Sequence, residues 1–479
     1  MSRFTSRRMF LGASSAVLGG AALSGAGTLV VPRIARAESS PWDMVPQILG
    51  RISPPVFPNR TFDVRHYGAT GDGKTDCTKA FRDAIVACSA AGGGRVLVPG
   101  KGTYRTGPIR LSSKVELHVA AGATIRFRTD AASYLPTVFT RWQGIECYNY
   151  SPFIYAFGQS NIAITGPGTI DGNAQEGPWF DFDPKRGPDW DRLQQMAVDG
   201  VPVSERQFGD GHFLKPNMIQ LYRCRNIAIA GVTIRNPAMW AIHPVLCTNV
   251  TVRGVRVYSR GAMVDGCDPE SCANVHITGC SFDTGDDGTV IKSGRDIDGR
   301  RIGVPSEDIV IEDCDYYGRW GAITIGSEMS GGVRNVFAQD CRIHAGSSYH
   351  SFHALYIKTN QRRGGVVDGI YVRRISGGPV DRGVLFVDMK YSLTGPGAGD
   401  VVYPTVRNIR VEEMTIDDSP YAVRVVGLPQ SPLDGLHVAR SSFTHIDQPA
   451  PDIRDARNVV FDRVTINGDP VEGFDDGGT

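Results

Sequence analysis

The sequence predicts an all-β protein folded as a parallel β-helix, a solenoid in which each turn of the chain forms one coil. The first observation is a repeated motif of Asn, Asp or Gly followed by alternating β-branched residues. Its shortest intervals are 23 to 27 residues, and self-similarity at such a period is typical of solenoids. The second is that Gly is abundant, with 57 residues, while long amphipathic helical patterns are scarce. The copies begin at residues 161, 226, 249, 274, 308, 335, 369, 408, 435 and 458.

The N-terminal 37 residues carry the features of an export signal. A twin-arginine motif over residues 6–11 is followed by an apolar stretch over residues 11–31, and residues 35–37 form a small-x-small cleavage site. Gly and Ser interrupt the apolar stretch, which argues against a membrane anchor, and no other run is long enough to span a bilayer. We therefore expect export by the twin-arginine pathway to the periplasm or beyond, with no membrane segment in the mature protein.

Removal of this signal changes the charge balance of the chain. It holds five of the 51 Lys and Arg residues and no acidic residue, so 46 basic residues remain against 50 acidic ones, a net charge of −4. This balance lacks the basic surface of a nucleic-acid-binding protein. No pattern in the sequence indicates an oligomeric state.

Six of the ten cysteines follow the same repeat. Three stand two residues before a repeat Asn, and three stand six residues after the first residue of a repeat. We expect them to form interior columns of small apolar thiols, one per coil, with the repeat Asn residues forming a ladder of turn amides. One or two disulfides remain an alternative, with Cys267–Cys272 the first candidate by proximity. The six are Cys224, Cys247, Cys272, Cys280, Cys314 and Cys341.

Two adjacent carboxylates, Asp286 and Asp287, stand between Gly285 and Gly288. Successive strand residues point to opposite faces, but flanking glycines permit a bend that turns both side chains outward. Asp265 comes 21 residues earlier, about one coil, so we expect it beside the pair. Clustered carboxylates raise at least one pKa, and a protonated acid beside an ionised base suits glycoside hydrolysis. A solvated acidic turn or a calcium site remains an alternative.

Four motifs in this region resemble the polygalacturonases, family 28 of the glycoside hydrolases, and especially their bacterial exo-acting branch. The resemblance extends from about residue 62 to about residue 468, and implies a right-handed parallel β-helix with an N-terminal cap. It also implies hydrolysis of pectic polysaccharides with inversion, without a metal or other cofactor. Asp286 would be the general acid, and Asp265 and Asp287 would position and activate water. The motifs are VDGCDPESC, TGDDGTVIKSG, GAITIGSEMSGGVRNV and IKTNQRRGG.

Together, these features divide the chain. The one clear helical pattern covers residues 78–90, with Gly at 92–94 as a stop. The predicted parts are a signal peptide (1–37), a linker (38–60), the N-terminal cap with the first coils (61–130) and the β-helix catalytic domain (131–479).

Three positions depart from the family pattern. Met263 replaces an Asn two residues before the first catalytic Asp, Trp320 replaces a His, and Tyr356 replaces an Arg that grips the sugar carboxylate together with a Lys. That Lys is retained as Lys358. Because Tyr cannot make the bidentate contact of Arg, we expect plain polygalacturonate to be bound less tightly than in the family.

Three further features are candidate parts of a substrate site. His243 lies one coil before Asp265 and is a candidate substrate contact, although a structural role is the alternative. Lys292 is expected to pair with the acidic cluster or with a substrate carboxylate. The aromatic-rich segment 173–215 either walls one end of a cleft, as exo action requires, or packs on its own aromatic side chains.

Several functions fit this pattern. The altered site is compatible with an exo-polygalacturonase, with an enzyme that cleaves another pectic linkage such as a rhamnogalacturonan, or with a carbohydrate-binding protein that has no turnover. A calcium-dependent lyase fits less well, because it needs a basic proton abstractor.

Overall fold

The structure, a computed structural model of the 479-residue chain, describes residues 40–393, 395–396 and 400–471. The predicted export signal, residues 1–37, lies outside the described residues. The described residues from Pro41 onward form one compact unit. Within its described part, no helix is long and apolar enough to cross a membrane.

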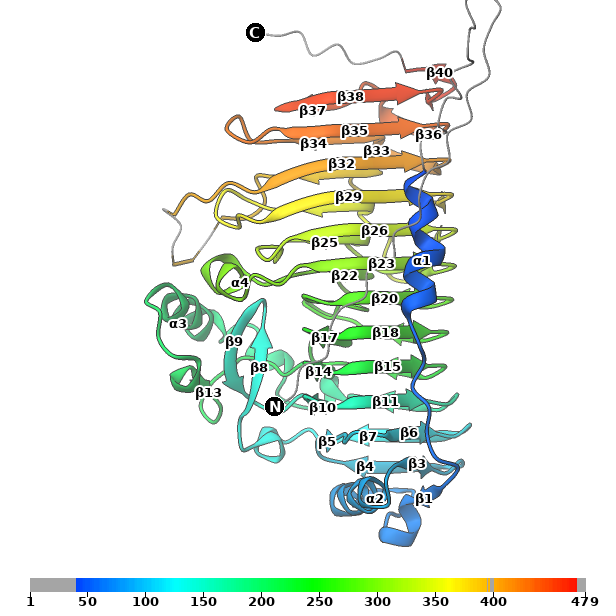
Figure 1. Ribbon diagram of the computed structural model, residues 1–479, viewed down its shortest axis with the longest axis vertical. Helices are drawn as coiled ribbons and strands as arrows, with labels where there is room; N and C mark the ends of the chain where they lie inside the picture. The colour runs from blue at the N-terminus through cyan, green and yellow to red at the C-terminus, as the bar shows by residue number, and fades with distance from the viewer. Residues whose placement is uncertain (1–39, 394, 397–399, 472–479) are drawn as a thin grey trace, which may run out of the picture. The chain divides into compact units, whose positions relative to one another are not determined.

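Short strands stack in three long parallel sheets (Figure 1), which confirms the predicted all-β, right-handed parallel β-helix. The first sheet holds the repeat motif. Its strands are β1 (Thr61–Asp63), β3 (Gly94–Val98), β6 (Val115–Val119), β11 (Ser160–Thr165), β15 (Arg225–Ala230), β18 (Thr248–Arg253), β20 (Ala273–Thr278), β23 (Ser306–Glu312), β26 (Val333–Gln339), β29 (Val366–Arg373), β32 (Thr405–Glu412), β35 (Leu433–Ala439) and β38 (Ala456–Asp462).

The second sheet follows the first within each coil. Its strands are β2 (Asp72–Asp76), β4 (Gly102–Thr106), β7 (Ala123–Phe127), β12 (Thr169–Asp171), β16 (Thr233–Arg235), β19 (Arg256–Tyr258), β21 (Ser281–Asp283), β24 (Asp315–Tyr316), β27 (Arg342–Ile343), β30 (Ser376–Gly377), β33 (Thr415–Tyr421), β36 (Ser442–Gln448), β39 (Thr465–Ile466) and β40 (Asp469–Pro470).

The third sheet has two parts, joined by single bridges from Cys267 to Ile242 and Thr289 and from Glu270 to Val245 and Lys292. The first part comprises β5 (Ile109–Arg110), β10 (Ile154–Phe157), β14 (Ile219–Tyr222) and β17 (Ile242–Val245). The second comprises β22 (Thr289–Ile291), β25 (Gly321–Gly326), β28 (His353–Lys358), β31 (Leu385–Asp388), β34 (Val423–Val426) and β37 (Asp452–Arg454).

The repeat explains the interior of the solenoid. Equivalent apolar residues pair from coil to coil in the first sheet, so each buried side chain stacks on a similar one. Asn226 and Asn249 have left-handed backbone conformations, which Asn tolerates, and their amides bond at 3.1 Å. The predicted amide ladder is therefore confirmed.

The cysteine columns are also confirmed. All ten thiols are buried and unpaired, so the alternative Cys267–Cys272 disulfide is not formed. The backbone N–H of Cys224 lies 3.4 Å from the sulfur of Cys247, whose own N–H lies 3.4 Å from the sulfur of Cys272.

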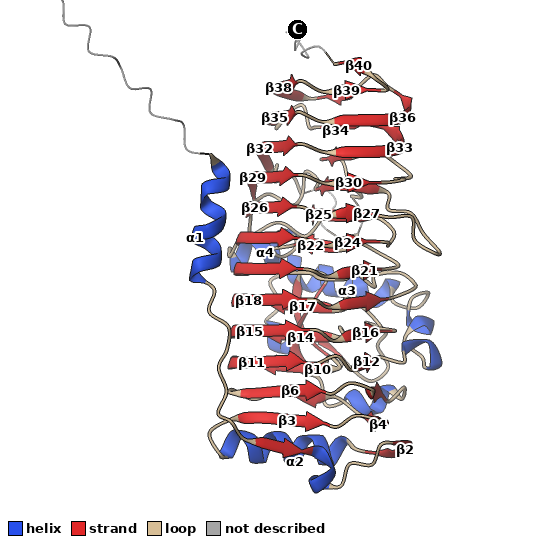
Figure 2. Cartoon of the chain, turned by 90° about the vertical axis from the view of Figure 1, so that its right-hand side faces the viewer, coloured by secondary structure: helices blue, strands red, loops and turns tan. Residues whose placement is uncertain are grey.

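Residues 38–60, predicted to be a linker, instead contain helix α1 (Met44–Arg51). Trp42 and the buried face of α1 pack on Val310 and Phe337, which point outward from the first sheet. Figure 2 shows the helix lying along that sheet. The prediction missed it because its apolar stripe is short and its partners lie far along the chain.

Additional elements lie at both ends of the solenoid. Helix α2 (Thr78–Ala90), at the predicted position, buries Phe81 and Ile85 against the first coils. At the other end, β40 pairs antiparallel with β39 and includes Pro470. The core continues across the predicted boundary at residue 130, because Phe127 and Tyr134 both pack on Phe153.

Additional elements lie beside the third sheet (Figure 1). They are β8 (Val138–Trp142), β9 (Ile145–Asn149), β13 (Gln207–Phe208), α3 (Gly187–Val198) and α4 (Asp296–Ile302). Segment 173–215 therefore has regular structure, and its aromatics pack inward, with Trp179 and Phe182 5.3 Å apart. It also borders the coil of Asp265, because the ammonium of Lys215 donates to the carbonyl of Ala262 at 3.1 Å.

Candidate active site

The three predicted carboxylates lie together at the N-terminal edge of the third sheet, on two successive coils. The N–H of Gly266 donates to the carbonyl of Asp287 at 3.0 Å, which aligns the two coils. One oxygen from each of Asp265, Asp286 and Asp287 lies within 4.8 Å of the others. The adjacency predicted from the repeat is therefore correct.

The flanking glycines allow close approach between coils. A Cβ at Gly285 would meet the carbonyl oxygen of Gly261 at 2.5 Å, and one at Gly288 would meet the ring of Tyr316 at 2.5 Å. Any larger residue would separate the coils that hold the carboxylates.

Asp287 is a fully engaged carboxylate. One oxygen accepts from the N–H of Gly321 at 2.7 Å and from the hydroxyl of Thr324 at 3.0 Å. The other accepts from Lys358 at 2.5 Å. Burial alone would lower the pKa of Lys358, but the charges of Asp287 and other neighbours raise it well above its ordinary value. The pair is therefore a fixed ion pair at the base of the site.

The pKa of Asp286 is raised, which is the direction that a general acid requires. Burial and the adjacent charge of Asp287 raise its pKa, although Lys358 opposes the shift. Its two oxygens accept from the N–H groups of Met263 at 3.0 Å and Asp287 at 2.9 Å. These bonds fix the carboxyl group while its proton remains available to a substrate oxygen.

Asp265 faces a fourth carboxylate, Asp268, which the sequence did not single out. Lys292 lies 3.9 Å from an oxygen of each. Burial and the mutual repulsion of these groups raise the pKa of Asp265, and burial raises that of Asp268. One oxygen of Asp265 and both oxygens of Asp268 are buried without a donor among the described residues. One proton shared between the two carboxyls satisfies this arrangement, because a single ammonium cannot balance both charges.

Comparison with known proteins agrees with this geometry. The model of the family "Glycosyl hydrolases family 28" matches residues 88–418, which is more than half of the chain. The chain belongs to glycosyl hydrolases family 28. Family 28 members are glycoside hydrolases, and the resemblance expected from the motifs is confirmed.

Relatives in family 28 cover most of the chain. A crystal structure of a hyperthermoactive exopolygalacturonase from Thermotoga maritima is 40% identical, with a TM-score of 0.85, over 90% of this chain and 97% of that one. A probable polygalacturonase of Vitis vinifera is 29% identical over 78% of this chain and 72% of its own length. The exo-poly-alpha-D-galacturonosidase of Dickeya chrysanthemi is 26% identical over 77% of this chain and 64% of its own length.

His243 is not placed to touch substrate in this family 28 protein. Its ring is fully buried, 3.0 Å from the amide of Gln220 and 2.7 Å from the carboxylate of Glu270. Burial lowers its pKa. Glu270 also pairs with Arg141 at 3.2 Å. The predicted substrate contact is therefore wrong, because neighbouring coils supply partners that enclose the imidazole.

Lys292 also points inward rather than toward a substrate. Its ammonium donates to Glu328 at 3.0 Å and lies 4.5 Å from the ring centroid of Trp240. Of the two roles expected for it, the structure supports pairing with the acidic cluster. The nearby charges of Glu328, Asp265 and Asp268 outweigh burial and raise its pKa.

The three departures from the family pattern have different roles. Met263 supplies its backbone N–H to Asp286, while its side chain packs in an apolar cluster. Trp320 is partly exposed and lies one coil after Asp286 in the same column, since Thr289 pairs with Ile323. Tyr356 is only 4% exposed, and its ring stacks on Phe386 at 5.5 Å. Tyr356 therefore backs Lys358 rather than reaching outward.

The sequence analysis also missed His353. Its ring lies 4.4 Å from that of Tyr356, and its Nδ1 is 2.9 Å from the carbonyl of Gly383. Burial lowers its pKa to about 4, so the imidazole is neutral near pH 7. The register could have located it, because His353 pairs with Gly321 one coil earlier.

The carboxylate trio also has the donor chemistry of a divalent cation site. In the described structure, Lys358 and Lys292 place two ammonium groups against the same carboxylates. These cations balance negative charge that a metal ion would otherwise balance.

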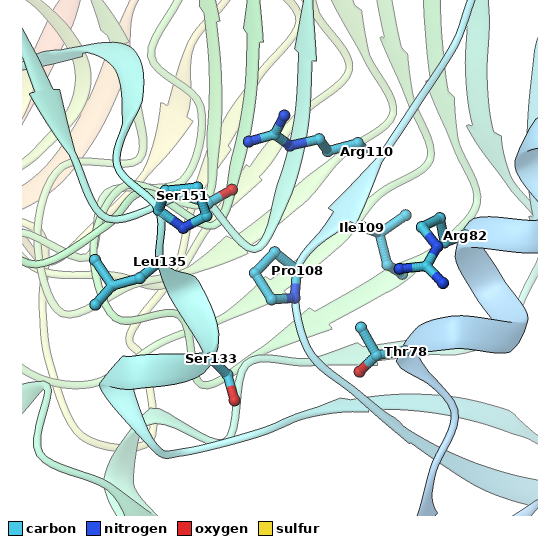
Figure 3. Close-up of a pocket in the computed structure, with 9 residues that line it drawn as sticks. Thr78, Arg82, Pro108, Ile109, Arg110, Ser133, Leu135 and Ser151 are labelled. Atoms are coloured by element: carbon cyan, nitrogen blue, oxygen red, sulfur yellow. The ribbon is translucent and has the colours of Figure 1, made fainter.

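A separate hollow of ≈290 Å³ opens between α2 and β5 and is lined by Thr78, Pro108 and Arg110 (Figure 3). β5 is three strands before β17 in the third sheet. This hollow is therefore distant from the coils that carry the carboxylates.

Proposed function

We propose that this protein hydrolyses galacturonosyl or closely related linkages in pectic polysaccharides. The main support for this proposal is that Asp286, a carboxyl group with a raised pKa, lies beside the ion pair of Asp287 and Lys358. The names of the relatives, which are polygalacturonases of exo-acting and other kinds, support this substrate class. We also propose exo action, supported by the 40% identical exopolygalacturonase.

In the proposed mechanism, Asp286 donates its proton to the glycosidic oxygen as the bond to the anomeric carbon breaks. Asp265 accepts a proton from water, and the oxygen of that water attacks the anomeric carbon. Asp287, fixed by Lys358, orients the water. No protein–sugar bond forms, so the product has the inverted configuration.

Two observations bear on inversion and point in different directions. The closest oxygens lie within 4.8 Å, which is shorter than the ~6.5–9.5 Å between the carboxyl groups of typical inverting pairs. However, donors engage both oxygens of Asp287, which disfavours its use as a nucleophile. We give the hydrogen-bond pattern more weight, because the spacing rule assumes that acid and base are the only carboxylates present.

The test is hydrolysis of polygalacturonate by the native protein and by Asp265→Asn, Asp286→Asn and Asp287→Asn. Each replacement keeps the size of the side chain and should lower kcat on the order of a hundredfold or more. Proton NMR of the first product reports its anomeric configuration. Full activity of Asp286→Asn, or unsaturated products that absorb in the ultraviolet, would refute the proposal.

A second candidate, cleavage of a decorated or mixed pectic linkage, is favoured by Trp320. Its partly exposed ring offers an apolar face where the family places a polar imidazole. A panel of pectic oligosaccharides, compared by kcat/KM with polygalacturonate, distinguishes the two candidates.

Residues 1–37 support a further proposal, export by the twin-arginine pathway to the periplasm or outside the cell. Replacing Arg7 and Arg8 by Lys should retain the protein in the cytoplasm, as measured by cell fractionation. Unchanged export of that variant would contradict this route.

A further inference from the structure

Beyond Trp320, the edge of the third sheet continues as a column of aromatic and arginine side chains. Trp320, Phe352 and Arg382 occupy equivalent positions on three successive coils. The backbone N–H of Phe352 donates to the carbonyl oxygen of Trp320, and the backbone N–H of Arg382 donates to the carbonyl oxygen of Phe352. Asp286 occupies the preceding position in this column, since Thr289 pairs with Ile323. With coils ~4.8 Å apart, Arg382 is ~14 Å along the solenoid from Asp286.

The column borders an open hollow of ≈510 Å³. Its lining includes Arg319, Tyr349 and Phe352, together with the hydroxyl groups of Ser347 and Ser348. The hollow therefore spans the coil of Trp320, which supplies Arg319, and the next coil, which supplies Phe352.

Two guanidinium groups lie against the aromatic rings of this hollow. Arg382 lies 3.9 Å from the ring centroid of Phe352 and 5.4 Å from that of Trp320. Arg319 lies 5.2 Å from Phe352 and 5.6 Å from Tyr349. Stacking holds the planar groups while leaving their N–H donors at the edges available.

Neither guanidinium has an anionic partner within the part of the chain that the structure describes. Asp381, which also lines the hollow, pairs with His350 at 3.0 Å, and Asp283 pairs with Arg260 at 2.8 Å. Both Arg319 and Arg382 are exposed. Two preorganised, unpaired guanidiniums beside an open hollow form a site for a carboxylate.

We propose that Arg319 and Arg382, with the rings of Phe352 and Tyr349, form a distal subsite that binds the carboxylate of a uronic acid unit. This inference rests on the proposed function, and it goes beyond it by assigning residues to a unit outside the two that flank the cleaved bond. The subsite also places charged recognition of the polymer on the two coils that flank Tyr356, the position where the family's arginine is missing.

The test measures kcat/KM on oligogalacturonates of increasing length for the native protein and for Arg319→Gln with Arg382→Gln. The double variant should lose on the order of tenfold or more on long substrates, since a hydrogen bond to a charged group is worth ~1.5–3 kcal/mol. Digalacturonate, which covers only the cleaved bond, should be hydrolysed at the native rate. Arg382→Lys keeps the charge without the planar fork and should retain part of the activity.

Arg342→Gln is the matched control, because it removes the same charge from an exposed arginine that already pairs with Asp315. It should leave the length dependence unchanged. Methyl-esterified oligosaccharides, which lack the carboxylate, should not distinguish the double variant from the native protein.

Equal losses of the double variant on every length, or no loss on any, would overturn the subsite. If the native protein cleaves no galacturonide, the proposed function fails instead. The subsite is then tested separately by calorimetric titration of a long oligogalacturonate, which the native protein should bind more tightly than the double variant.

Discussion

Asp268 should control the protonation of Asp265, and replacing it offers a sharp test of the shared proton. Asp268→Asn provides a neutral amide that can donate to Asp265 at all pH values. Asp268→Leu has a similar volume and no donor. Both variants remove one carboxylate from the buried group around Lys292, so the comparison between them isolates the hydrogen bond.

The size of the effect follows from the energy of that bond. A hydrogen bond to a charged group is worth ~1.5–3 kcal/mol, and one pKa unit is ~1.4 kcal/mol. The amide of the Asn variant stabilises the ionised form of Asp265 and lowers its pKa. In the Leu variant burial still raises that pKa without a compensating donor. The acid limb of kcat/KM should therefore lie ~1–2 pH units lower for Asp268→Asn than for Asp268→Leu.

The assay is the pH dependence of kcat/KM on polygalacturonate, measured from reducing ends released. Thermal unfolding at each pH confirms that both variants remain folded over the range. If kcat/KM falls at the same acidic pH for Asp268→Asn and Asp268→Leu, the proposal of a shared proton is refuted. So would an Asn variant as inactive as Asp265→Asn, because it would give Asp268 a direct chemical role.

Three further predictions follow from the site and the core. In the absence of reductant, all ten thiols should react with a thiol reagent only after the protein is denatured, since all are buried and unpaired. Finding four or more disulfides would contradict the cysteine columns. Chelators should leave hydrolysis unchanged, because Lys358 and Lys292 balance the carboxylate charge; loss of activity would assign a cation to the trio. Tyr356→Arg combined with Trp320→His should raise kcat/KM on plain polygalacturonate by about tenfold; no gain would show that these positions do not set the preference.

The repeat made the carboxylate trio predictable. Residues one period apart stack in a solenoid, so the 21-residue interval between Asp265 and Asp286 was sufficient to place them together. The same logic located the cysteine columns and the Asn ladder. The period of the repeat therefore predicts which residues are neighbours on successive coils, because each coil stacks in register on the one before it.

Periodicity did not reveal which side chains enclose one another. His243 was expected at the substrate, but Gln220 and Glu270 from adjacent coils enclose it. Asp268 escaped notice because a single carboxylate near a turn is usually solvated, and only the structure shows its burial. Helix α1 was missed for a related reason, since eight residues with one apolar stripe are a weak helical signal.

The elements at the ends of the solenoid have a consequence for how the molecule behaves in a crowded solution. Stacked strands ~4.8 Å apart have the same spacing as the cross-β core of amyloid, and an open terminal coil would act as a template for another chain. At one end α2 shields the first coils. At the other, β40 reverses direction and places Pro470, which has no N–H to donate, in the last described strand. These two short elements hinder end-to-end pairing of solenoids through the first coils and through the second sheet.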